Sequence, residues 1–158
     1  CALPILSICY EDGIQQVYLN GSNVTDRLRE EAVGNMASVS SAVREVRARL
    51  LDLQRNLAKE ADVIMDGRDI GTNILPNADV KIYLTASVKT RADRRYKELT
   101  EKGISCSYEE IAEDIKKRDE RDMSRETAPL KQAEDAILID SSDMSIEEVV
   151  HAICRQCK

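Results

Sequence analysis

The most restrictive feature of the sequence is a short apolar run that passes directly into a charged, glycine-containing segment. Residues 63–65 are Val-Ile-Met, and residues 66–72 are Asp-Gly-Arg-Asp-Ile-Gly-Thr. Apolar runs of this length that end at glycine are typical of buried strands in a parallel sheet. In open α/β sheets, ligands bind just beyond the carboxyl ends of the strands. The pattern therefore predicts a strand at 63–65 and a ligand site at Arg68 and Asp69.

The residue types in this segment suit a ligand that carries a phosphate and an amine. The glycines let the backbone approach a ligand closely, and the guanidinium of Arg68 can hold a phosphate with its planar fork. The carboxylate of Asp69 can accept a hydrogen bond from an exocyclic amine such as N4 of cytosine. The alternative is a surface ion pair of little energetic value, and Gly-Arg-Asp alone favours that alternative.

The longer run favours the ligand site, because Asp-Gly-Arg-Asp-Ile-Gly-Thr resembles a motif of the bacterial cytidylate kinase family. The resemblance extends from about Ile5 to the end of the chain. It implies an α/β fold of the P-loop nucleoside-monophosphate-kinase type, with three layers, a parallel sheet that is incomplete here, a small antiparallel insert that binds the monophosphate, and a helical lid. It also implies that ATP, with Mg²⁺, phosphorylates CMP and dCMP to CDP and dCDP in pyrimidine nucleotide metabolism.

The resemblance divides the chain into two parts. Residues 1–60 are expected to form the monophosphate-binding insert, with strands at 5–10 and 16–19 separated by the turn signal Glu11-Asp12-Gly13. Residues 61–158 are expected to form the C-terminal part of the kinase core, with a lid at about 88–128 and further strands at 80–84 and 136–139.

Both parts contain residues that are typical of the starts and ends of helices. Thr25 is a candidate N-cap for a helix at 26–31, and Ser87 for a helix that ends near Gly103. Ser107 and Ser145 each precede a Glu by three residues, which is the spacing of a capping box. Apolar side chains at helical spacing predict a long amphipathic helix, through Val43, Val46, Leu50, Leu53 and Leu57, and a last helix that buries Ile146, Val149, Val150 and Ile153.

A second charged segment, residues 116–125, supports the nucleotide interpretation. If it is helical, Arg118, Asp122 and Arg125 share one face. Most such charge runs are solvated helix faces. The functional interpretation is an anion site, where grouped arginines stabilise a phosphoryl group as its charge redistributes.

The same segment, followed by Ala128-Pro129-Leu130, resembles the cytidylate kinase pattern, which implies residue roles. Arg118 and Asp122 would bind the CMP ribose, and the phosphate would meet Arg68 and Arg125. The complete set expected to recognise CMP is Ser38, Arg47, Arg68, Asp69, Arg118, Asp122 and Arg125. The set expected to stabilise charge during transfer is Arg68, Arg121 and Arg125. At the start of the lid-like segment, the candidates for ATP contact are Arg94 and Arg95.

The Gly-rich loop that holds the ATP phosphates in this family does not occur among residues 1–158. That loop ends in Gly-Lys-Ser/Thr, and its hydroxyl holds Mg²⁺, but none of the six glycines precedes such a pair. We therefore expect an N-terminally truncated fragment without the P-loop part, and no metal ligand in this chain. Unpaired strand edges would then make the isolated chain poorly stable or leave a gap that another chain fills.

Composition restricts the partners. A net charge of −6 and the absence of Trp and Phe argue against nucleic-acid binding. No apolar run approaches the roughly 20 residues of a membrane helix. Five irregularly spaced cysteines suit reduced thiols in a cytosol. The expectation is a cytoplasmic protein, monomeric when full length, whose partners are CMP, dCMP and ATP.

Three alternatives remain open. The chain could be a non-catalytic CMP-binding fragment, which would show binding without turnover. It could be a UMP/CMP-type or adenylate-type kinase, although the Asp-Gly-Arg-Asp-Ile-Gly-Thr run argues against both. It could also be a helical interaction protein whose segment 116–125 docks an acidic partner, which would show salt-sensitive protein binding and no response to nucleotides.

Overall fold

The computed structural model describes residues 6–157, apart from the side chains at positions 31 and 38. The chain forms two compact units, residues 1–47 and 48–158. The boundary falls inside the long helix α2 (Arg44–Glu60), which is the amphipathic helix expected from the apolar stripe.

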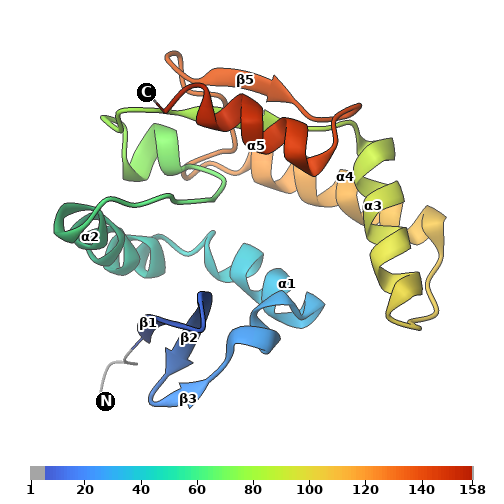
Figure 1. The fold of residues 1–158 in the computed structure, drawn as a ribbon, viewed down its shortest axis with the longest axis horizontal. Coiled ribbons are helices and arrows are strands. Elements are labelled where there is room, and N and C mark those ends of the chain that lie inside the picture. The colour runs from blue at the N-terminus through green and yellow to red at the C-terminus, as the bar shows by residue number, and fades with distance from the viewer. Residues whose placement is uncertain (1–5, 158) are drawn as a thin grey trace. The chain divides into compact units, whose positions relative to one another are not determined.

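The first unit is a small antiparallel sheet followed by helices (Figure 1). The strands β1 (Leu6–Glu11), β2 (Ile14–Leu19) and β3 (Ser22–Asn23) pair in sequence order. Both turns, Asp12-Gly13 and Asn20-Gly21, have positive φ at their two central residues, as a tight type I′ hairpin turn requires. The two predicted strands and the turn between them are therefore confirmed for the described residues.

The helix predicted at 26–31 is wrong in type and in its cap. The chain forms a 3₁₀ helix, η1 (Thr25–Arg29), without a side-chain cap, and then α1 (Glu31–Ser40). The hydroxyl oxygen of Thr25 instead accepts a hydrogen bond from the backbone N–H of Val17 at 2.9 Å. A contact to the neighbouring strand thus occupies the group that would have capped the helix.

The second unit combines a two-stranded parallel sheet with helices. Strands β4 (Ile82–Thr85) and β5 (Ile137–Asp140) pair in register from Ile82 opposite Ile137 to Thr85 opposite Asp140, close to the positions predicted. Helices α3 (Val88–Glu101) and α4 (Tyr108–Ser124) follow β4 and pack as an antiparallel hairpin (Figure 1). Their N-caps are Ser87 and Ser107, as predicted. At Ser107 only half of the predicted capping box forms: its Oγ accepts from the N–H of Glu110 at 3.3 Å and donates to the carboxylate of Glu109 at 3.0 Å.

The strand predicted at 63–65 is not formed. Within the described residues, segment 61–69 is irregular, and the side chain of Ile64 is fully exposed. A strand requires a neighbouring backbone with which it can exchange hydrogen bonds. In the described chain β4 pairs with β5 alone, so this segment has no ladder partner. The π-helical turn η2 (Ile70–Ile74) follows it directly.

The last helix, α5 (Ile146–Cys154), has the predicted capping box but not the predicted buried face. The Oγ of Ser145 accepts from the N–H of Glu148 at 3.2 Å, and the N–H of Ser145 donates to the Glu148 carboxylate at 2.8 Å. These bonds also lower the pKa of Glu148. Val149 and Ile153 are half-buried, whereas Ile146 is 84% and Val150 51% exposed, because no described element covers that side of the helix.

We expect Ser145→Ala to destabilise α5 selectively. The substitution removes the acceptor for one N–H of the first turn, and an N-cap serine contributes about 1 kcal/mol. Amide hydrogen exchange should show faster exchange across residues 146–154, while Ser145→Asp, which keeps an acceptor, should restore protection. Unchanged exchange in Ser145→Ala would contradict the assigned role of the cap.

Candidate functional site

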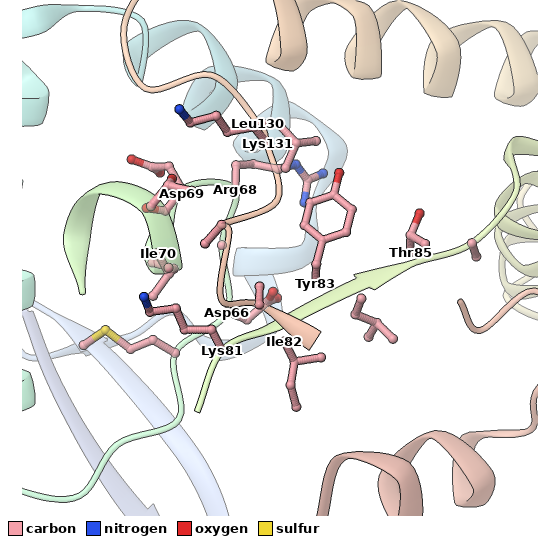
Figure 2. A pocket seen from close by; sticks show the side chains of 18 of the residues that line it. Asp66, Arg68, Asp69, Ile70, Lys81, Ile82, Tyr83, Thr85, Leu130 and Lys131 are labelled. Atoms are coloured by element: carbon pink, nitrogen blue, oxygen red, sulfur yellow. The ribbon is translucent and has the colours of Figure 1, made fainter. Parts of the chain in front are cut away.

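A cavity of about 410 Å³, lined by both polar and apolar side chains, lies in the second unit, within the usual size range of small-molecule sites. Its walls come from the loop at 65–72, from β4 and the residues around it, and from parts of α4 and of segment 130–136. Figure 2 shows the side chains of Arg68 and Asp69 on the loop, that of Lys81 just before β4 and that of Tyr83 on β4. The loop at 65–72, which contains the most restrictive motif of the sequence, therefore forms a wall of this cavity.

Arg68 is joined to α4 by an ion pair. Its Nε donates to Oδ2 of Asp122 at 3.0 Å, and the Asp122 carboxylate is almost completely buried. The Nε of Arg118, one helical turn away on α4, lies 3.9 Å from the same oxygen. Two cations thus converge on one buried carboxylate. A buried carboxylate without such a partner would be strongly destabilising.

A second pair joins Asp69 to the end of α4. The Nη2 of Arg125 lies 3.9 Å from Oδ1 of Asp69, and both side chains are at least nine-tenths buried. The Nε of Arg125 donates to the carbonyl of Ala128 at 2.7 Å, while the amide of Asn73 donates to Oδ2 of Asp69 at 3.1 Å. The adjacent residues Arg68 and Asp69 therefore contact two positions on the helix side, Asp122 and Arg125.

The structure brings together five of the positions singled out from the sequence: Arg68, Asp69, Arg118, Asp122 and Arg125. Arg68 and Asp69 lie in the cavity wall, and the three others contact them or each other behind it. The cluster combines cations that suit a phosphate with carboxylates that suit hydroxyl and amine donors. Such a combination suits a ligand that carries a phosphate together with hydroxyl or amine groups.

Three other candidates do not belong to the contacts described above. Arg121 is exposed on α4. Ser38, within α1, and Arg47, on α2, both belong to the first unit. Arg47 donates to the carbonyl of Ser41 at 3.3 Å. Their role toward the cluster stays a prediction.

Arg94 and Arg95, the candidates for ATP contact, are held on α3 by protein groups. Arg94 lines the cavity and donates to the carbonyl oxygens of Ser141 at 2.6 Å and Met144 at 3.3 Å, which fastens α3 to the turn after β5. Arg95 forms an ion pair with Glu98 at 2.9 Å on the same helix.

Two further ion pairs border the cavity, and the sequence analysis did not predict either of them. Lys81, whose side chain is 7% exposed, contacts both carboxylate oxygens of Asp135 at 2.6 and 2.8 Å and also the carbonyl of Pro76. Arg91 contacts Asp119. Each pair joins residues far apart in the chain, so no local spacing reveals it.

Among residues 6–157, no group of three His, Cys, Asp or Glu side chains is placed to hold a metal ion. In the same part of the chain, no helix has both the length and the apolar character needed to cross a membrane.

Comparison with known proteins identifies the relatives of this chain. The cytidylate kinase family model matches residues 5–158. The chain is 54% identical to the cytidylate kinase of Caldicellulosiruptor bescii over 142 residues, which cover 90% of this chain and 63% of that protein. It is 46% identical to the cytidylate kinase of Bacillus subtilis over 146 residues, covering 92% of this chain and 65% of the relative. The chain thus spans less than two thirds of the length of these relatives.

We expect Gly67→Ala to distort the site loop. A Cβ at this position would lie 2.9 Å from Cγ1 and 3.0 Å from Cδ1 of Ile70, so Ile70 must move. Overpacking of this kind costs about 1–3 kcal/mol, which urea unfolding can measure. Gly71→Ala is the matched control, because its Cβ would meet the side chain of Lys81 at an ordinary 3.4 Å. Equal losses in both variants would contradict this explanation.

We expect the Lys81–Asp135 pair to contribute to acid sensitivity. The hydrogen bond from Lys81 lowers the pKa of Asp135 from its ordinary 3.8. A lowered folded-state pKa stabilises the protein above the unfolded value, and this stabilisation is lost as the pH falls through the folded value.

Urea unfolding between pH 7 and pH 3 can check this expectation. The difference in unfolding free energy between the wild type and Lys81→Met should shrink as the pH falls below about 4. The control is Lys97→Met, which removes an exposed lysine whose pair with Glu101 lies on α3. A difference for Lys81→Met that stays constant with pH would count against the pair.

Proposed function

This chain belongs to the cytidylate kinase family, and on that premise we propose that it provides the acceptor-nucleotide site for transfer of the γ-phosphoryl group of ATP to CMP or dCMP. The products are CDP and dCDP. The observation that carries the proposal is the pair of contacts Arg68–Asp122 and Asp69–Arg125, which join the cavity loop to the end of α4.

The ion pairs explain how a monophosphate can enter without leaving a buried charge unpartnered. The phosphate of CMP offers Arg68 an anion in place of Asp122. The ribose hydroxyls in turn offer hydrogen-bond donors to the Asp122 carboxylate. Arg118 shares that carboxylate already and would contact the same ribose. Binding thus exchanges one set of partners for another.

Asp69 supports the choice of cytosine. A carboxylate accepts hydrogen bonds, and cytosine presents an amine at position 4 where uracil presents a carbonyl. Asn73 and Arg125 hold the carboxylate on the wall of the cavity. On the family resemblance, Ser38 and Arg47 would also take part in recognising CMP.

Catalysis in this proposal consists of positioning and charge stabilisation. The acceptor is already a phosphate oxygen, so no strong general base or covalent intermediate is needed. Arg68, Arg121 and Arg125 would stabilise the charge that spreads over the transferred group. Arg94 and Arg95 would contact ATP.

Residues 1–158 contain no Gly-Lys-Ser/Thr loop for the ATP phosphates, so the residues assigned here concern mainly the acceptor. Mg²⁺ would arrive with ATP. Among the described residues, no group of three His, Cys, Asp or Glu side chains is placed to hold the ion by itself.

In this proposal residues 1–60 form the monophosphate-binding insert, and residues 61–158 form the C-terminal core with a lid at about 88–128. The protein would act as a monomer in the cytoplasm of a bacterial cell, in pyrimidine nucleotide metabolism. The described cysteines are all free thiols, which suits a reducing compartment.

Thermal unfolding with added nucleotides tests this function. CMP at about 100 times its dissociation constant should add roughly 2.7 kcal/mol of stability, and so raise the melting temperature. Arg68→Ala should abolish the shift because it removes the phosphate partner. Lys117→Gln, which breaks an exposed pair with Glu113 on α4, should leave it intact. An equal shift with UMP would reject cytosine selectivity, and the lack of any CMP-dependent shift would reject the site.

A further inference from the structure

Arg91 connects three elements around the cavity through one guanidinium. Its Nε donates to the carbonyl of Ala86, just after β4, at 3.0 Å. Its Nη1 and Nη2 donate to the two carboxylate oxygens of Asp119, on α4, at 2.9 and 2.6 Å. Arg91 itself lies in the first turn of α3. The end of the strand, the start of α3 and the middle of α4 therefore meet at this side chain.

The contact is stronger than an ordinary surface ion pair. It is bidentate, and the side chains of Arg91 and Asp119 are 35% and 20% exposed. The hydrogen bonds to Asp119 raise the pKa of Arg91 above its ordinary value. Planar two-point pairing of this kind fixes orientation as well as distance. At the far end of the hairpin, the rings of Tyr96 and Tyr108 stack edge to face at 6.0 Å, so α3 and α4 are tied at two levels.

Asp119 lies close to the candidate acceptor site along α4. It precedes Asp122 by three residues, which places the two residues on the same side of the helix, with their backbone positions about 4.5 Å apart along its axis. Asp119 is paired with Arg91, while Asp122 is paired with Arg68. Asp119, Arg91 and Arg68 all line the cavity.

We propose that Arg91 is a positioning residue of the acceptor site, which sets the register of α4 through Asp119 and thereby presents Asp122 and Arg125 to a pyrimidine nucleoside monophosphate. This inference rests on the function proposed above for the same site. Arg91 acts through Asp119 and makes no contact with the nucleotide in this proposal. The Ala86 carbonyl holds the guanidinium at the end of β4. The position of α4 is therefore fixed relative to the end of that strand.

The first test measures CMP affinity by calorimetry together with the thermal midpoint of the chain. Arg91→Lys keeps the charge but cannot form the fork, and Asp119→Asn keeps the shape but loses the charge. Each should weaken CMP binding by about tenfold or more, as small displacements of a site do, in excess of any change explained by the midpoint. Lys117→Gln on α4 is the matched control and should bind CMP like the wild type.

Charge reversal separates positioning from general damage. Arg91→Asp and Asp119→Arg should each weaken CMP binding, and the double variant should bind CMP more tightly than the weaker-binding single variant because contacting residues couple. Recovery should stay incomplete, because Arg91→Asp removes the donor to the Ala86 carbonyl. A double variant no better than the worse single variant would overturn the proposal. So would single variants at either position that bind CMP like the wild type.

A second readout requires no nucleotide. The Nε–H of Arg68, bonded to Asp122 in the wild type, should give an exchange-protected signal in ¹⁵N NMR spectra. That signal should weaken in Arg91→Lys and persist in Lys117→Gln. If the wild type fails to bind CMP while the signal follows this pattern, the proposed function fails and the positioning role stands. If CMP binds to the wild type and to Arg91→Lys alike, the positioning role alone fails.

Discussion

The burial of Asp122 is the constraint on which the site depends. A carboxylate that is 3% exposed inside a protein is strongly destabilising unless it is paired or hydrogen-bonded, and its nearest cation is Arg68, 54 positions earlier in the chain. The pair therefore fixes the loop at 66–69 against α4 and creates one wall of the cavity. Asp69 and Arg125 repeat this arrangement one position later on the loop and one turn later on the helix. The cluster is a consequence of satisfying two buried carboxylates.

The fold class expected from the sequence, an α/β fold of the P-loop nucleoside-monophosphate-kinase type, is confirmed by the family match and by the mixed α/β structure with its small parallel sheet. Its local features were predictable because the signals are local. Asp12-Gly13 can adopt the positive φ of a hairpin turn, and Ser87 and Ser145 cap the helices that follow them. The strand at 63–65 could not be decided locally, since a strand exists only beside a partner.

The site shows the same division between local and distant information. The motif placed Arg68 and Asp69, and helical spacing placed Arg118 beside Asp122 on α4. The cross-pairing between loop and helix is not encoded in any spacing, because it depends on how α4 returns to the loop. Arg91 illustrates the limit most clearly: on α3 it is one arginine among several, and its partner Asp119 is revealed only by the α3–α4 hairpin.

The two arginine–carboxylate pairs differ in a way that suits different tasks. Arg68 contacts Asp122 through Nε, and its side chain remains 43% exposed, so a phosphate can reach the guanidinium without displacing the loop. Arg91 uses three nitrogens at once, two on Asp119 and one on the Ala86 carbonyl. A one-point contact exchanges readily, whereas a three-point contact resists rotation of the planar group. The geometry thus combines an exchangeable pair at the cavity with a fixed pair on the same helix, so that exchange of ligands at Arg68 need not shift α4.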